Sequence, residues 1–273
     1  MNNKYQVYLI SDSTGETLDR IFLALQAQFS NFNYKSHQCA FTRTENQILK
    51  ILDLCKKNKN SIILYTIVDI GLAKFLGTNS RKNNIPCFGV LGDLILNFSK
   101  LLNQKASHLP SGQHALDEEY YKRIEAIQFT MNHDDGKITN DIEKSDIILL
   151  GISRTSKTPT SIYLANRGYK TCNIPIISAN TIPKKLKDNP QISCVIGLIV
   201  EPSRLLDVRK NRMISMHEKR PSSYTDLEKI RLEIELAKKI YKENKWPVID
   251  VTRKSVEETA ASVIKIYDIT HSK

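Results

Sequence analysis

The sequence has no long apolar run, no closely spaced cysteine pair and few aromatic residues. No segment approaches the roughly 18 apolar residues of a membrane-spanning helix, and the apolar stretch ending at Ile10 is too short for a signal-peptide core. The five cysteines are odd in number and form no C-x-x-C pair, which excludes a disulfide framework and a cysteine zinc site. We therefore expect a cytoplasmic protein with no membrane partner.

The chain is basic, with a formal net charge of +11 over 273 residues. This charge favours anionic partners such as nucleotides and phosphoproteins, although part of it is typical of any solvated, lysine-rich surface. Aromatic residues make up only 7% of the chain and are not interleaved with the basic runs. Platforms for base stacking are therefore not evident. A nucleic-acid-binding module is the alternative that we rank last, and we expect no nucleic-acid partner.

Strand and helix patterns alternate along the chain. In the first hundred residues we predict strands at 5–10, 36–41, 61–68 and 85–91, with intervening helices at 15–29, 44–57 and 70–82. The later strands are expected at 146–150, 173–178, 195–200 and 247–251, and the later helices at 116–131, 159–166, 203–216, 225–243 and 255–269. Near-continuous apolar strands between helices predict parallel sheets covered on both faces. A polar break at 103–112 divides the chain into two α/β units.

One loop carries the strongest chemical signal. The apolar run 147–150 leads directly into Gly-Ile-Ser-Arg-Thr-Ser-Lys-Thr, close to the phosphate-loop pattern G-x-x-x-x-G-K-[ST] between a strand and a helix. In such a loop backbone N–H groups bind phosphate oxygens, the lysine reaches the terminal phosphates and the last hydroxyl ligates Mg²⁺. Lys157 is therefore a catalytic candidate and Thr158 a metal ligand. The predicted nucleotide-binding residues are Gly151, Ile152, Ser153, Arg154, Thr155, Ser156, Lys157 and Thr158.

Two positions depart from the simple pattern. Ser156 replaces the second glycine, so the loop either accepts a strain of roughly 1–2 kcal/mol or folds slightly differently. Pro159 suits the first position of a helix. Thr158 would then be the N-cap, and its hydroxyl would cap the helix instead of meeting a metal. The alternative to a phosphate site is a plain strand-to-helix turn with a surface lysine.

Two acidic motifs offer further candidates. The segment Ser11–Thr17 follows the first strand and opens a helix, a position that suits an anion. Within it, Asp12 is either a catalytic base or a helix cap. The segment His133–Gly136 contains Asp134, which could bind a metal or act as a general base, although Asp-Gly is also typical of a tight turn.

A basic stretch near the middle of the second unit supplies the last candidates. Arg209 and Arg212 lie three residues apart and are expected to share a helix face. They could close over a transferring phosphoryl group. The alternative is a solvated basic helix.

Several motifs together resemble one known family over almost the whole chain. They occur in order as Ser11–Thr17, Arg123–Ala126, His133–Gly136, Gly151–Pro159, Asn173–Pro175, Arg209-x-x-Arg212 and Asp250–Thr252. This combination is similar to the pyruvate, phosphate dikinase regulatory proteins, which share a family with the phosphoenolpyruvate synthase regulatory proteins. The serine in the 151–159 stretch is that family's own variant of the loop.

The resemblance implies a fold and an activity. The fold is a Rossmann-like parallel-sheet domain at 1–110 followed by a P-loop kinase-like α/β domain at 111–273 that begins with a linking helix. The activity is bifunctional: a serine/threonine kinase that uses ADP to phosphorylate and inactivate pyruvate, phosphate dikinase, and a phosphorylase that removes the phosphate with inorganic phosphate and releases pyrophosphate. Mg²⁺ is the expected cofactor, and family members are often dimeric. The alternatives are the same chemistry on phosphoenolpyruvate synthase, or an ATP-dependent small-molecule kinase.

Overall fold

The computed structural model describes residues 4–112, 118–136, 141–215 and 223–271. The chain divides into two compact units, 1–115 and 116–273, which we describe separately. No helix in the described ranges is long and apolar enough to cross a membrane.

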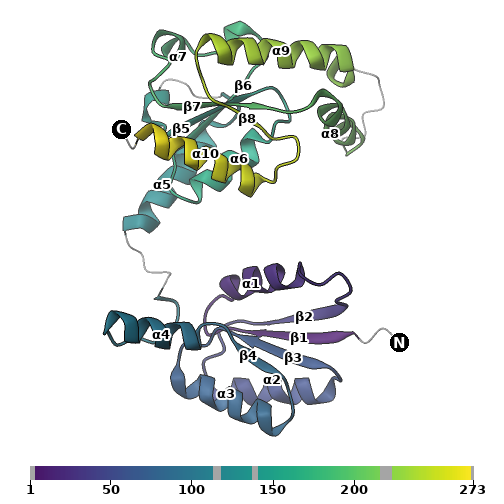
Figure 1. Cartoon of the computed structure of the whole chain (residues 1–273), viewed down its shortest axis with the longest axis vertical. Coiled ribbons are helices and arrows are strands. Elements are labelled where there is room, and N and C mark those ends of the chain that lie inside the picture. The colour runs from purple at the N-terminus through teal and green to yellow at the C-terminus, as the bar shows by residue number, and fades with distance from the viewer. Residues whose placement is uncertain (1–3, 113–117, 137–140, 216–222, 272–273) are drawn as a thin grey trace. The chain divides into compact units, whose positions relative to one another are not determined.

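Unit 1 is a parallel four-stranded sheet with helices on both faces (Figure 1). Its strands are β1 (Tyr5–Ile10), β2 (Tyr34–Cys39), β3 (Ser61–Tyr65) and β4 (Cys87–Gly89), and its helices are α1 (Glu16–Gln26), α2 (Glu45–Lys57), α3 (Ile70–Lys82) and α4 (Gly92–Leu102). A capping box begins α2, in which Thr44 and Gln47 cap each other's backbone N–H groups. The sequence patterns did not predict α4.

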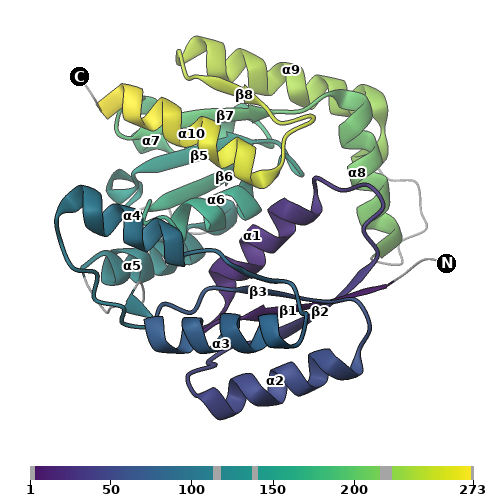
Figure 2. The same ribbon diagram turned by 60° about the horizontal axis from the view of Figure 1, so that its bottom comes forward.

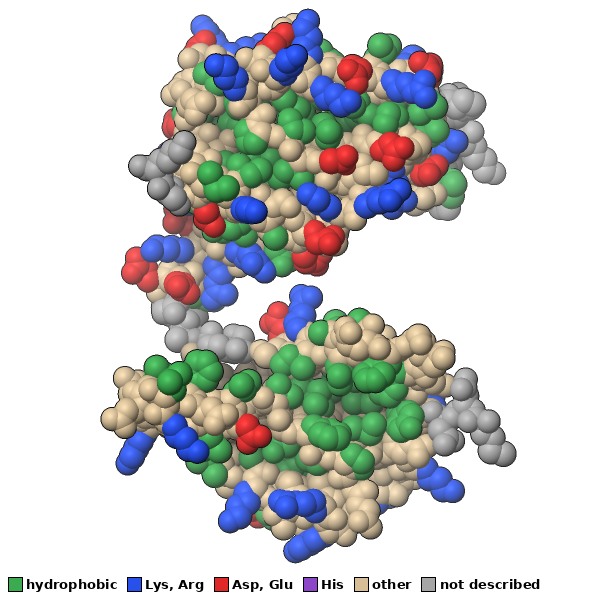
Figure 3. All heavy atoms as spheres, in the orientation of Figure 1, with side chains coloured by type: hydrophobic (Ala, Val, Ile, Leu, Met, Phe, Trp, Pro, Cys, Tyr) green, Lys and Arg blue, Asp and Glu red, His purple; other side chains and the backbone are tan. Residues whose placement is uncertain are grey.

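Two apolar clusters hold unit 1 together, one on each face of the sheet. Successive side chains of a strand point to opposite faces. Accordingly, Val7 and Leu9 of β1 pack with α1, whereas Tyr8 and Ile10 pack with α2 and α3. On the α1 side an apolar surface stays open, and Figure 3 shows hydrophobic side chains gathered below that helix.

Unit 2 is a second parallel four-stranded sheet. Its strands are β5 (Ile147–Gly151), β6 (Thr171–Pro175), β7 (Cys194–Ile199) and β8 (Val248–Asp250). Its α-helices are α5 (Glu118–Asn132), α6 (Lys157–Ala165), α7 (Lys184–Asp188), α8 (Pro202–Ser215), α9 (Leu227–Glu243) and α10 (Val256–His271). Short 3-10 turns are η2 (Asp134–Gly136), η3 (Ile142–Lys144), η4 (Ala179–Thr181) and η5 (Ser223–Thr225).

The core of unit 2 lies between the sheet and its two helical layers. Figure 1 shows α6 and α10 on one face and α9 on the other. All of β5 is buried, which explains why it reads as an unbroken apolar run. From α9, Tyr241 packs against Gly197 of the inner strand β7. Its hydroxyl donates to the carbonyls of Leu150 and Leu198 at 3.2 and 3.4 Å.

Both sheets have the same strand order. In unit 1 it is β2-β1-β3-β4 and in unit 2 it is β6-β5-β7-β8, so the first strand of each unit lies between the second and the third (Figure 2). In open parallel sheets of this order, ligands bind at the carboxyl ends of the strands, where the order reverses beside the first strand. The predicted α/β fold class is confirmed, and the topology directs attention to the loops that follow β1 and β5.

Candidate active site

The 151–158 loop joins the end of β5 to the start of α6. Arg154 and Ser156 have positive φ angles of 74° and 60°, so the strained alternative for Ser156 is the one that the structure shows. Within the described chain, the consecutive N–H groups of residues 154–158 have no hydrogen-bond partner. Free N–H groups at the start of a helix form an anion-binding nest. The geometry of the loop is therefore suited to binding a phosphate.

Helix α6 begins two residues earlier than we predicted from the position of Pro159. Because α6 starts at Lys157, Ser156 is the N-cap residue and Pro159 stands at the third helical position. The predicted N-cap role of Thr158 is wrong. Its hydroxyl is instead free to point sideways, towards η2.

Close packing fixes the base of the loop. Thr155 is fully buried, and its hydroxyl donates to the carbonyl of Ile152 at 2.9 Å. A Cβ at Gly151 would collide with that hydroxyl and would lie 3.2 Å from the carbonyl oxygen of Leu198. Glycine is therefore required at 151 by space, not by its φ angle.

Lys157 is buried in the loop that it follows. Only 5% of the residue is exposed, and its Nζ donates to the carbonyl of Ile152 at 3.1 Å. Burial lowers the pKa of Lys157 to about 8, and the nearby Asp135 and Asp134 oppose this shift. The ammonium group of Lys157 is therefore poorly solvated. An anion bound in the loop would stabilise its positive charge.

Thr158, Asp134 and Asn173 form a hydrogen-bonded cluster beside the lysine. The Thr158 hydroxyl donates to Asp134 Oδ1 at 3.0 Å. Asn173, on β6, donates through Nδ2 to Asp134 and to Thr158 Oγ1, and its Oδ1 accepts the N–H of Asp135 at 3.2 Å. The Asp-Gly segment is a tight turn, with φ 53° at Asp135, and this turn brings Asp134 to the loop. The role of Asp134 as a metal ligand or base stays a prediction. Sequence reasoning gave Asn173 no role, although a buried asparagine in an apolar strand is itself a signal.

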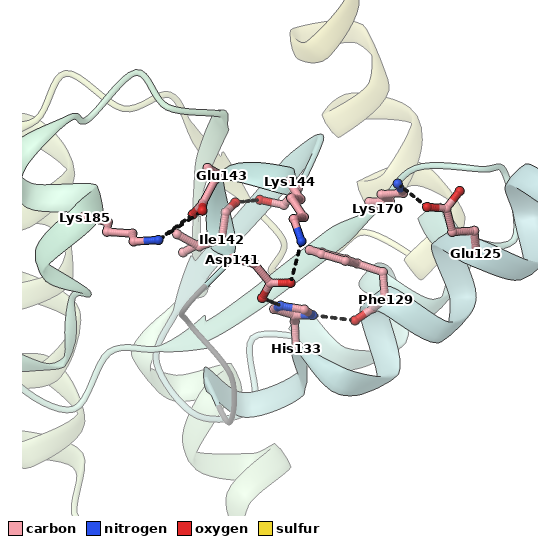
Figure 4. A network of polar contacts seen from close by, with 10 residues as sticks. Glu125, Phe129, His133, Asp141, Ile142, Glu143, Lys144, Lys170 and Lys185 are labelled. Atoms are coloured by element: carbon pink, nitrogen blue, oxygen red, sulfur yellow. Dashed lines mark hydrogen bonds and ion pairs between the residues drawn. The ribbon is translucent and has the colours of Figure 1, made fainter.

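A second network supports this turn from behind. His133, at the end of α5, is buried, and its ring nitrogens lie 2.7 Å from the Phe129 carbonyl and 2.8 Å from Asp141 Oδ1 (Figure 4). The carbonyl of His133 accepts the N–H of Asn173 at 3.2 Å. The residue before Asp134 is thus tied to both α5 and β6, which fixes where the carboxylate points.

Arg209 and Arg212 differ from the expected pair on one face. Arg209 is 1% exposed and pairs with Glu233 at 2.6 Å, whereas Arg212 is exposed. Arg209 Nη2 also donates to the Ser153 carbonyl at 3.3 Å, and its guanidinium lies 4.5 Å from the centre of the Tyr224 ring. In this structure Arg209 braces the loop from behind instead of facing an open site.

The loop and η2 enclose a polar cavity of about 280 Å³. Its lining residues are Asp135, Ser153, Arg154, Ser156, Lys157, Thr158, Pro159, Pro175 and Val208. Of the eight predicted nucleotide-binding residues, five border this cavity. The other three, Gly151, Ile152 and Thr155, do not border it. They contact other residues of the loop at its base. The cavity is smaller than the 300–1,000 Å³ of most small-molecule pockets, so it matches the phosphate end of a nucleotide.

Asp12 lies in unit 1, after β1. Its carboxylate accepts the N–H of Val68 at 2.7 Å and the residue is 3% exposed. The helix-cap alternative is wrong, because Gly15 is the N-cap residue of α1 and no side chain caps that helix. The role of Asp12 as a base stays a prediction.

The chain is similar to known proteins over almost its whole length. The family model described as Kinase/pyrophosphorylase matches residues 7–264. A protein of Pelagibacter ubique is 67% identical over 98% of both chains, and one of Sphingopyxis alaskensis is 43% identical over 97% of this chain and 98% of its own. Each bears the name "Putative pyruvate, phosphate dikinase regulatory protein". The chain is therefore a member of the kinase/pyrophosphorylase family.

Proposed function

We propose that this protein is an ADP-dependent serine/threonine kinase and a phosphate-dependent, pyrophosphate-forming phosphorylase that acts on pyruvate, phosphate dikinase. The observation that carries the proposal is the cavity of about 280 Å³ that Lys157 and Thr158 border. The N–H groups of 154–158 have no partner among the described residues, and Thr158 is hydrogen-bonded to Asp134 beside the cavity. The names of the relatives support the choice of protein substrate.

The forward reaction is a transfer of the β-phosphoryl group. The threonine oxygen of the substrate attacks the β-phosphorus of ADP, the bond from that phosphorus to the bridging oxygen breaks, and AMP leaves with the electron pair. The threonine proton passes to a base, for which Asp134 and Asp12 are the candidates. The N–H groups and Lys157 stabilise the charge on the phosphoryl oxygens without any covalent role for the protein.

The return reaction uses the same anion site. An oxygen of inorganic phosphate attacks the phosphorus of phosphothreonine, the bond to the threonine oxygen breaks, and that oxygen takes a proton. The products are free threonine and pyrophosphate. A loop that holds a diphosphate in one direction is suited to the pyrophosphate formed in the other, because both are chains of two phosphoryl groups.

Mg²⁺ fits the residues beside the loop. Mg²⁺ in phosphoryl-transfer enzymes is held by one or two carboxylates together with substrate phosphates and water. Thr158 and Asp134 would hold it here, and Asp135 borders the same cavity. The ion would neutralise charge on the phosphates.

The test is transfer from ADP labelled at the β-phosphate to phosphohistidine-loaded pyruvate, phosphate dikinase. We expect label on a threonine, and we expect it to leave as pyrophosphate when phosphate is added. Lys157→Ala should abolish both steps while the circular dichroism spectrum stays native. Label on phosphoenolpyruvate synthase alone would reassign the substrate. Turnover of ATP with a small molecule and none with either protein would overturn the proposal.

A further inference from the structure

Unit 2 contains a second cavity at the same edge of the sheet as the 151–158 loop. It has a volume of about 410 Å³ and lies where the chain leaves β7 and β8, which run parallel to β5. None of its lining residues belongs to the loop or borders the cavity of about 280 Å³. These residues are Glu201, Ser203, Arg204, Asp207, Thr252 and Arg253.

The two cavities lie along one helix. Helix α8 starts just after β7, and its residues border both of them (Figure 1). Arg204 and Asp207 border the larger cavity, and Val208 borders the smaller one. Residues four apart in a helix, such as Arg204 and Val208, share one face. The cavities are therefore neighbours, separated by about one turn of α8.

The Asp250–Thr252 motif shapes the larger cavity. The carboxylate of Asp250, at the end of β8, accepts both the N–H and the hydroxyl of Thr252. Thr252 Oγ1 in turn accepts the N–H of Glu201 at 2.9 Å. The loop after β8 is thus tied to the start of α8, and these two segments are the walls of the cavity.

Four charged side chains border this cavity without pairing. Two are the arginines at 204 and 253, and two are the carboxylates of Glu201 and Asp207; no ion pair joins them in the described ranges. A free guanidinium plane can stack on a flat ring, and a free carboxylate accepts from hydroxyl and amino groups. Mixed charges of this kind suit a simple anion poorly. They suit a nucleoside, which offers a flat base together with amino and hydroxyl donors.

The larger cavity also supplies room that the loop cavity lacks. About 280 Å³ matches only the phosphate end of a nucleotide, whereas about 410 Å³ falls within the usual range of small-molecule pockets. We propose that this cavity is the nucleoside subsite, in which Arg204 and Arg253 stack on the base of ADP and Glu201 and Asp207 accept from its amino group and the ribose hydroxyls. The subsite rests on the proposed function, which assigns the phosphates of ADP to the 151–158 loop.

The test compares ADP with pyrophosphate, which has two linked phosphoryl groups but no nucleoside. Titration calorimetry of the full chain with Mg²⁺ measures the affinity for each. We expect Arg204→Ala and Arg253→Ala each to weaken ADP binding by at least about fivefold, the effect of one lost stacking contact. Their affinity for pyrophosphate should stay native, because both arginines are exposed and solvent screens their charge. Lys157→Ala should weaken the binding of both ligands.

Lys210→Ala is the matched control, because Lys210 is exposed on α8 and borders neither cavity. It should bind both ligands as the native chain does. Native ADP affinity in both arginine variants, or an equal loss of ADP and pyrophosphate affinity, would overturn the nucleoside subsite. Unaltered binding of both ligands by Lys157→Ala would instead count against the proposed function. A native chain that binds neither ligand would overturn both.

Discussion

The hydroxyl of Thr158 donates a hydrogen bond of 3.0 Å to the carboxylate of Asp134. These residues are 24 positions apart in the sequence and come from α6 and η2. The bond joins the hydroxyl expected to bind a metal to a carboxylate that could bind a metal or act as a base. A hydroxyl and a carboxylate together hold Mg²⁺ in phosphate-loop enzymes.

From this pair we predict a change in metal dependence. Asp134→Asn and Thr158→Val each remove one Mg²⁺ ligand, so the Mg²⁺ concentration for half-maximal transfer should rise about tenfold or more. The measurement is the rate of transfer against Mg²⁺ concentration. Thr160→Val is the matched control, because Thr160 lies on the same helix, is fully buried and has an unpartnered hydroxyl. An unchanged Mg²⁺ dependence in both site variants would remove the pair from the metal site.

Asn173 should act as a positioning residue. Asn173→Ala leaves the Asp135 N–H without its partner and removes the hydrogen bonds that Asn173 donates to Asp134 and Thr158, which should cost about 1–3 kcal/mol of unfolding free energy. We expect a lower kcat with a smaller change in KM for ADP. Asn173→Asp should slow transfer further, because its carboxylate would face that of Asp134. Denaturant unfolding and steady-state kinetics measure the two effects, and a stable variant with full activity would contradict this role.

A change of arginine to lysine at each position should distinguish the role of Arg209 from that of Arg212. Arg209→Lys loses the forked contact to Glu233 and the ring contact to Tyr224, while Arg212→Lys changes an exposed side chain. We expect the first variant to lose about 1–3 kcal/mol of stability and to bind ADP more weakly, because the loop carbonyl of Ser153 loses its brace. The second variant should keep native stability. Thermal melts and ADP titrations would show this contrast, and equal ADP affinities in the two variants would argue against a bracing role.

The fold class and the 151–158 loop could be predicted from the sequence because each depends on residues that are close together in the chain. Buried parallel strands read as apolar runs, and the loop residues are contiguous. The start of α6 was missed, because Pro159 is acceptable in the first turn as well as at the first position. The role of Arg209 was also missed, since its partner Glu233 lies on another helix and no local pattern reports that pairing.

The cluster around Asn173 shows the same limit. Its hydrogen bonds span 15 and 39 positions, and they exist only once β6 lies beside β5. Helix α4 was missed although its sequence is amphipathic. None of its residues is buried in the structure.

A substitution at Asp12 can separate a catalytic role of this residue from a structural one. In Asp12→Asn the side-chain oxygen can still accept the N–H of Val68, so the fold should be retained. If Asp12 is the base, the kcat of transfer should fall by about 10²-fold or more, with ADP binding unchanged. Single-turnover transfer and ADP titration measure the two separately. A native kcat would assign Asp12 to the structure of unit 1 alone.

The depressed pKa of Lys157 predicts a pH dependence of ADP binding. Its pKa of about 8 means that, at pH 8, about half of the free protein carries a neutral lysine. Phosphate favours the charged form, so binding should take up about half a proton at pH 8 and about a tenth at pH 7. Affinity should fall as the pH rises through 8, because a neutral lysine must first gain a proton.

Calorimetry in two buffers of different ionisation enthalpy measures this uptake. Lys157→Arg is the matched control, because a guanidinium stays charged throughout this range and should show no uptake near pH 8. Equal uptake by the native protein and this variant would assign the proton to another group. Binding by the native protein with no uptake at pH 8 would mean that Lys157 is already charged when it meets ADP, and that burial does not lower its pKa in solution.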